Sequence, residues 1–300
     1  MNNQAYQKNP IKVINSLLLL LSMFFLMNCA QRKGGDSARS GQMTLAVDRQ
    51  LRDIASSQIE TFTRYYPDAV IKLHSSGSDK TIPQLLDRNV RAALISGEPE
   101  AVEDSLFATM HHPLRREPVA RDAIVCIVNR TNPLSKLSLL ELKSLFSGKE
   151  SSGVTPLVTA DDYRLQSVFA AAAGMPKKEI RAGSCSSETE LINRVSTDNK
   201  AIGLLFRSSL DGVLKGGNGQ KDVKVIPLYK EADGSSPSEP TQQNIFEGSY
   251  PLVTTVYYVY YAGDALAAGF GSWLSTKGQK AFEKSSLAPY RAFERTIILK

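Results

Sequence analysis

The pattern of apolar and polar positions predicts short strands and helices that alternate along the chain. Apolar runs of strand length lie at 43–47, 69–73 and 92–96. Between them, apolar residues recur three or four positions apart over 51–62 and 82–86, which predicts amphipathic helices. This strand–helix–strand–helix–strand order is typical of a parallel sheet covered by helices.

The rest of the chain continues the alternation. Further strands are predicted at 123–128, 155–159, 201–205, 223–228 and 253–261. Further helices are predicted at 139–146, 165–172, 188–195, 265–274 and 278–284. The sequence contains no internal repeat, so the expected fold class is α/β rather than a repeat architecture.

The N-terminal segment has a different pattern and is predicted not to belong to the fold. Residues 1–28 contain Lys8 and Lys12, no acidic residue, and an apolar run at 17–27. That run is shorter than the roughly 20 apolar residues that a comfortable membrane span needs. A basic start followed by such a run is typical of a signal peptide, and the protein is therefore expected to be exported.

The apolar run ends at Cys29, and this junction resembles the lipobox of bacterial lipoproteins. The resemblance implies cleavage before Cys29, a lipid on that cysteine and a membrane-anchored protein on the periplasmic side. Asn28 departs from the small residue usual before the cysteine, so an ordinary signal peptide with an incidental cysteine is the alternative. Residues 29–41 are rich in Gly, Ser and charged residues and are predicted to form a flexible tether.

Composition and charge exclude several classes of protein. The chain of 300 residues is 42% hydrophobic and 22% charged, as in globular proteins. Its formal charge is +6, and removal of residues 1–28 with their two lysines leaves 272 residues at +4. This excess is too small to indicate nucleic-acid binding. Three cysteines exclude a disulfide scaffold, although a bond between Cys126 and Cys185 stays open.

Motifs of catalysis and metal binding are missing from the sequence. It contains no nucleophile elbow, no phosphate-binding loop and no dinucleotide-binding glycine motif. The three histidines, His74, His111 and His112, have no cysteine or carboxylate at ligand spacing. We therefore expect neither an enzyme nor a bound metal or cofactor.

The segment Ser75-Ser76-Gly77-Ser78 is the best candidate for an anion site. It lies between a predicted strand and a predicted helix. Hydroxyls and backbone N–H groups at a helix N-terminus bind anions, helped by the helix dipole. Gly77 would let the backbone come close to a ligand. The alternative is an ordinary helix cap without a ligand, because serine is common there.

Longer motifs then suggest a family. Residues 117–134, with 136–149, closely resemble the segment that crosses from the first lobe to the second in the phosphate-binding proteins of ABC transporters. Residues 199–203, 250–258 and 270–280 match further motifs of that family in the same order. The resemblance covers about residues 43–299.

This resemblance implies a two-lobed periplasmic-binding-protein type II fold with two strand crossovers. Lobe 1 would comprise 42–125 and 250–300, and lobe 2 would comprise 126–249. A small oxyanion, with phosphate as the leading candidate, would bind between the lobes, and closure about the hinge would trap it. The protein, expected to be a monomer, would then pass the ligand to an ABC permease. In the family the segment that corresponds to 75–77 contacts phosphate, and Ser75 matches the contacting serine. The candidate ligand-binding residues of this chain are Ser75, Ser76, Gly77, Arg49, Ser96, Tyr163 and Arg164.

The chain departs from the family at two loops. The first-lobe Gly-Ser-Ser/Thr loop is replaced by Val47-Asp48-Arg49, and the second-lobe Ser-Gly-Thr turn is absent from 159–165. Arg49 and Arg164 could instead bring positive charge from opposite lobes. The departures leave open a second hypothesis, a sensory or protein-interaction module without phosphate transport. Asp122 matches the family's crossover aspartate and is expected to have a structural partner near the hinge.

Overall fold

The computed structural model describes residues 35–109, 113–149, 153–216, 222–230 and 236–291. The chain separates into a unit of residues 1–36 and a unit of residues 37–300, and the description below concerns the second. The predicted signal peptide, Cys29, His111 and His112 lie outside the described residues. Within them, no helix is long and apolar enough to cross a membrane.

Lobe 1 begins with the alternation that the sequence predicts. Its elements are β1 (Gly41–Asp48), the 3₁₀ helix η1 (Arg49–Leu51), α2 (Arg52–Tyr65), β2 (Ala69–Ser76), α3 (Ser78–Leu86), β3 (Ala92–Ser96) and α4 (Ala101–Ala108). β1 pairs in parallel with both β2 and β3. β1 starts at Gly41, the last residue of the predicted tether, and a β-bridge between Ser37 and Ser40 precedes it.

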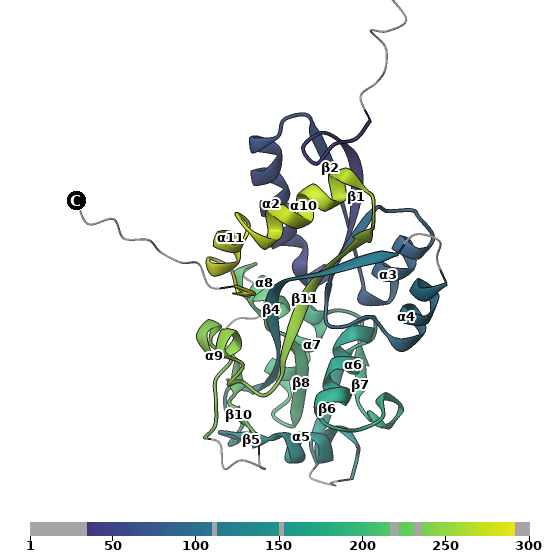
Figure 1. Ribbon diagram of the computed structural model, residues 1–300. Coiled ribbons are helices and arrows are strands. Elements are labelled where there is room, and N and C mark those ends of the chain that lie inside the picture. Colours follow the sequence, from purple (N-terminus) through teal and green to yellow (C-terminus); the bar gives the residue numbers. More distant parts are fainter. Residues whose placement is uncertain (1–34, 110–112, 150–152, 217–221, 231–235, 292–300) are drawn as a thin grey trace, which may run out of the picture. The chain divides into compact units, whose positions relative to one another are not determined.

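Two long strands pass between the lobes. β4 (Leu114–Asn129) pairs with β11 (Val253–Tyr261) up to Ala123, and from Ile124 it pairs with β8 (Ala201–Phe206). In Figure 1 both strands run through the middle of the ribbon. The lobe boundaries predicted at 125/126 and 249/250 stay a proposal. The change of pairing partner along β4, from β11 to β8, supports it.

Lobe 2 is a second α/β block. Its elements are β5 (Leu137–Ser138), α5 (Leu139–Phe146), β6 (Thr155–Thr159), α6 (Tyr163–Ala172), η2 (Lys177–Glu179), β7 (Gly183–Cys185), α7 (Glu188–Thr197), α8 (Arg207–Lys215), β9 (Val223–Ile226), β10 (Leu228–Tyr229) and α9 (Gln242–Glu247). The chain then returns through β11 to α10 (Ala265–Ser275), α11 (Gln279–Glu283) and β12 (Ala288–Pro289). The main sheet has the order β2-β1-β3-β11-β4-β8-β6-β7.

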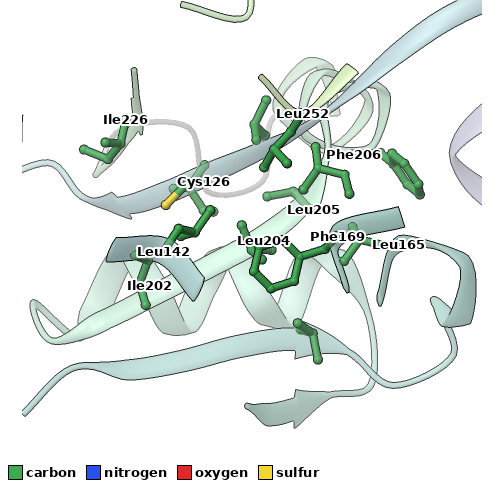
Figure 2. Close-up of a cluster of buried hydrophobic side chains, with 14 of the residues drawn as sticks. Cys126, Leu142, Leu165, Phe169, Ile202, Leu204, Leu205, Phe206, Ile226 and Leu252 are labelled. Atoms are coloured by element: carbon green, nitrogen blue, oxygen red, sulfur yellow. The ribbon is translucent and has the colours of Figure 1, made fainter. Parts of the chain in front are cut away.

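Each lobe has its own core. In lobe 1, Phe62 of α2 packs edge-on against Phe270 and Trp273 of α10, above the sheet residues of β1 and β11. Figure 2 shows the core of lobe 2, in which Phe169 and Leu204 lie among aliphatic side chains. Cys126 and Cys185 are both buried and both free, so the open question of their pairing is answered: they form no disulfide here.

Candidate functional site

The candidate site lies where strands of the two lobes end and helices begin. In lobe 1 the parallel strands β1, β2 and β3 end at Asp48, Ser76 and Ser96. In lobe 2, β6 ends at Thr159, and α6 begins at Tyr163. Ligands of α/β proteins bind in the crevice outside the carboxyl ends of such strands. The topology therefore brings most of the predicted site residues to one region between the lobes.

Arg164 of α6 is the main side chain that lobe 2 inserts into lobe 1. It is only 1% exposed. Its Nη2 donates to the carbonyl oxygen of Ser78 at 3.1 Å, and its Nη1 lies 3.3 Å from a carboxylate oxygen of Glu103. Its Nε lies 3.5 Å from Asp48 Oδ2. Burial alone would lower the pKa of Arg164, but the nearby carboxylates, Asp48 first, outweigh it and raise that pKa.

Asp48 is the fully buried partner of Arg164 at the end of β1. Its Oδ2 accepts the backbone N–H of Ser96 at 2.9 Å, which ties the ends of β1 and β3 together. Burial raises the pKa of Asp48, against the attraction of Arg164. Asp48 Oδ1, Ser96 Oγ and Arg164 Nε are buried and have no hydrogen-bond partner among the described residues.

Asp162 forms a second junction between the lobes. It caps α6 by accepting the backbone N–H of Leu165, and it also accepts the hydroxyl of Ser78 across the lobes, both at 3.2 Å. The same hydroxyl accepts the backbone N–H of Arg164 at 3.0 Å. Burial raises the pKa of Asp162 to about 7, and the negative charges of Asp48 and Glu188 act in the same direction.

Arg49 forms a third junction, nearer to solvent. Its guanidinium donates through both Nη atoms to the carboxylate of Asp161, and its Nη1 also lies 3.6 Å from Glu188 of α7. The hydrogen bond to Asp161 is the main reason that the pKa of Arg49 is raised. Arg49 and Arg164 thus reach across the lobes, as the sequence suggested, but each already has carboxylate partners.

The other predicted residues differ in how far they enter this region. Ser75 and Ser76 are half-buried at the end of β2, and Gly77 is buried as the N-cap of α3. Ser96 is fully buried. Tyr163 is 45% exposed, and its ring is covered by the ammonium group of Lys177. Residues 76–78, 96 and 164 are therefore brought together with Arg49, whereas Tyr163 lies at the exposed start of α6.

The sequence reasoning missed several partners. Glu103 lies on α4, a helix that was not predicted. Glu188 was predicted to begin a helix but not to take part in the site. Asp48, Asp161 and Asp162 were not among the predicted site residues. The region contains two guanidinium groups and five carboxyl groups: Arg49 and Arg164 with Asp48, Glu103, Asp161, Asp162 and Glu188. Carboxyl groups are thus in excess over cations.

Two cavities lie in or beside this region. One, of about 250 Å³, is bordered by Arg49, Gln50, Glu188 and Ser209. Another, of about 500 Å³, lies between Glu98–Ala101 of lobe 1 and α6 of lobe 2. Among the described residues, no group of His, Cys, Asp and Glu side chains is placed to hold a metal ion.

The hinge residue Asp122 has the structural role expected for it. It is fully buried on β4, accepts the backbone N–H of Ala123 at 2.8 Å and accepts the hydroxyl of Ser208 at the start of α8. Burial raises its pKa to about 6. These bonds fix α8 to the crossover strand close to the point where β4 changes partners.

Comparison with known proteins identifies the family. A model described as "PBP superfamily domain" matches residues 34–277. The chain belongs to the PBP superfamily. The phosphate-binding protein PstS of Pseudomonas aeruginosa is 24% identical over an alignment of length 281, and the match covers 85% of this chain and 85% of that one. The likeness to the phosphate-binding proteins seen in the sequence motifs is thereby confirmed, and proteins of this kind bind solutes rather than catalyse reactions.

Solved structures show the same fold. A phosphate ABC transporter substrate-binding protein of Clostridium perfringens, described with bound phosphate, superposes with a TM-score of 0.68 at 18% identity. The match covers 84% of this chain and 100% of that one. A phosphate transport receptor of Vibrio cholerae has a TM-score of 0.61 at 16% identity, with 82% and 99% covered. The predicted two-lobed α/β fold of the PBP superfamily is confirmed.

Proposed function

We propose that this PBP-superfamily protein is a monomer that captures a small inorganic oxyanion between its lobes and delivers it to an ABC importer. Phosphate is the leading candidate for this oxyanion. The names of its relatives support this substrate class and transport role. The observation that carries the proposal is the meeting of the α3 N-terminus with two guanidinium groups, Arg49 and Arg164, from opposite lobes. Helix N-termini and guanidinium groups are the groups with which proteins bind oxyanions.

The test is calorimetric titration of residues 30–300 with phosphate, sulfate and other small anions. We expect saturable binding of at least one oxyanion with a Kd of about 1 µM or tighter, which corresponds to roughly −8 kcal/mol. Arg49→Ala should weaken that binding about tenfold, because a charged hydrogen-bond donor is lost. Unchanged affinity in both Arg49→Ala and Arg164→Ala, with folded proteins, would exclude the two arginines as anion ligands.

A second candidate function is a sensory or protein-interaction module that uses the fold without transport. The observation that favours it is the excess of carboxyl groups between the lobes, where each guanidinium already has internal partners. Such a module would remain closed without a small ligand. A correctly folded protein that binds none of the anions in the titration would support this second candidate and exclude the first.

We also propose that lipid on Cys29 holds the protein at the membrane on the periplasmic side. The apolar run at 17–27 and the cysteine that follows it support this location. Because one acyl chain gives only marginal membrane binding, the anchor would carry more than one chain. Expressed with its own leader, the full chain should fractionate with membranes, and Cys29→Ser should move it to the soluble fraction. Membrane association that survives Cys29→Ser would refute the anchor.

A further inference from the structure

The carboxylate of Asp161 lies against the N-terminus of α3, where the anion of the proposed function would bind. A Cβ atom built on Gly77, the N-cap of α3, would lie 2.8 Å from Asp161 Oδ2 and 3.0 Å from its Cγ, and 2.7 Å from Oδ1 of Asp79 in the first turn of α3 itself. Only glycine leaves room for a carboxylate at that distance. The close approach that the sequence predicted between Gly77 and a ligand is thus made by a side chain of the protein itself.

The same carboxylate takes both donors of Arg49. Nη1 donates to Oδ1 at 3.3 Å and Nη2 donates to Oδ2, so the guanidinium holds the carboxylate in a two-pronged arrangement. Arginine binds phosphate and other oxyanions through the same pair of donors. Asp161 therefore occupies the Arg49 guanidinium, which an oxyanion bound at this position would need as its partner.

Besides the N-terminus of α3, other groups around the Asp161 carboxylate are typical of an anion site. α3 is nine residues long, and its N-cap, being glycine, has no side-chain oxygen to accept the first N–H groups. Arg164, which is 1% exposed, contacts the first residue of α3 through the carbonyl oxygen of Ser78. Its Nε has no hydrogen-bond partner among the described residues. That Nε faces Asp48 Oδ2 at 3.5 Å, so the positive charge of this buried guanidinium lies close to the helix end.

We propose that Asp161 is a tethered competitor for the oxyanion: it occupies the anion position in the ligand-free protein and must be displaced before a ligand binds. This inference rests on the proposed function. Asp161 belongs to lobe 2, whereas Gly77 and Arg49 belong to lobe 1, so the competitor also holds the lobes together without a ligand. An incoming oxyanion has to replace both the negative charge of Asp161 and the contact that Asp161 makes between the lobes.

The size of the effect follows from the occupancy of the position. The apparent Kd equals the intrinsic Kd divided by the fraction of protein whose site is free. If Asp161 occupies the position in about 90–99% of molecules, the apparent affinity is about 10- to 100-fold below the intrinsic one. Removing the negative charge of residue 161 should recover that factor.

The experiment compares phosphate and sulfate titrations of wild-type, Asp161→Asn and Asp68→Asn proteins. Asp161→Asn keeps the size of the side chain but removes its charge, and we expect at least tenfold tighter oxyanion binding. Asp68→Asn is the matched control, because it makes the same charge change at an exposed residue before β2, at the opposite end of that strand. It should leave the affinity as in wild type.

The outcomes separate this inference from the proposed function. If wild type binds an oxyanion and Asp161→Asn binds it equally or more weakly, the competitor role is overturned and the function stands. If wild type shows no binding and Asp161→Asn does, the competitor role is supported and anion capture by the unaltered protein is overturned. If neither binds, both are overturned. Asp161→Ala is measured in parallel, so the test holds even where the asparagine variant does not fold.

Discussion

At the scale of single residues, the most consequential side chain is Arg164. Its guanidinium is 1% exposed and faces Asp48, which is fully buried. A buried ion pair gives little net stability, because both charges lose their hydration. Removing one partner is different, since it leaves the other charge buried without compensation. Arg164 is therefore expected to matter more for stability than any exposed arginine of this chain.

We predict that Arg164→Ala lowers the free energy of unfolding by about 3–5 kcal/mol, the usual cost of breaking a buried pair. Urea denaturation followed by circular dichroism measures it. The double variant Arg164→Ala/Asp48→Asn should recover part of the loss, because the uncompensated carboxylate is then removed. Arg64→Ala, which breaks an exposed pair with Glu60, is the control and should change little. Equal losses in the single and double variants would contradict this account.

At the scale of elements, the sequence predicted the regular part of the fold well. The order β1, α2, β2, α3, β3 follows from apolar runs and helical spacing, which are local properties of the chain. α4, α8 and α9 were not predicted. α8 starts directly after a buried strand, so no turn marks its beginning, and Gly212 lies within its nine residues.

The first half of β4 was also missed, for a different reason. The prediction began this strand at Ala123, but β4 begins at Leu114 and includes Arg115, Arg116 and Glu117. Those polar residues do not form an apolar run. They belong to the strand because residues 114–123 of β4 pair with β11, and pairing between residues about 140 positions apart is not visible in a local pattern.

The candidate site shows the same limit. The signal of a strand end followed by a helix start located Ser76 and Gly77, because that signal is local. Alignment with the family's loops located both arginines. They could not assign partners: Arg49 and Asp161 are 112 residues apart, and the crossover of β4 and β11 brings them together. The absent Ser-Gly-Thr turn could be read from the sequence, but its replacement by an internal carboxylate required the fold.

At the scale of the whole molecule, ion pairs link lobe 1 to lobe 2 while no ligand is present. Arg49 pairs with Asp161 and Glu188, and Lys177 pairs with Glu100. These side chains are partly exposed, so each pair contributes up to about 1 kcal/mol and is weakened by salt. Together, the Arg49–Asp161 and Lys177–Glu100 pairs can shift an equilibrium between open and closed lobes by up to about 30-fold. They make a closed ligand-free form the expected majority.

We therefore predict that Arg49→Ala/Lys177→Ala opens the protein in the absence of anions. Small-angle X-ray scattering should give a larger radius of gyration for this double variant than for wild type at the same low ionic strength. The control Arg64→Ala/Lys200→Ala removes the same two charges from exposed positions within single lobes and should scatter like wild type. Sodium chloride at about 1 M, where the Debye length is about 3 Å, should move wild type toward the variant. Identical radii for all three proteins would mean that packing around the buried Arg164, and not the exposed pairs, holds the lobes closed.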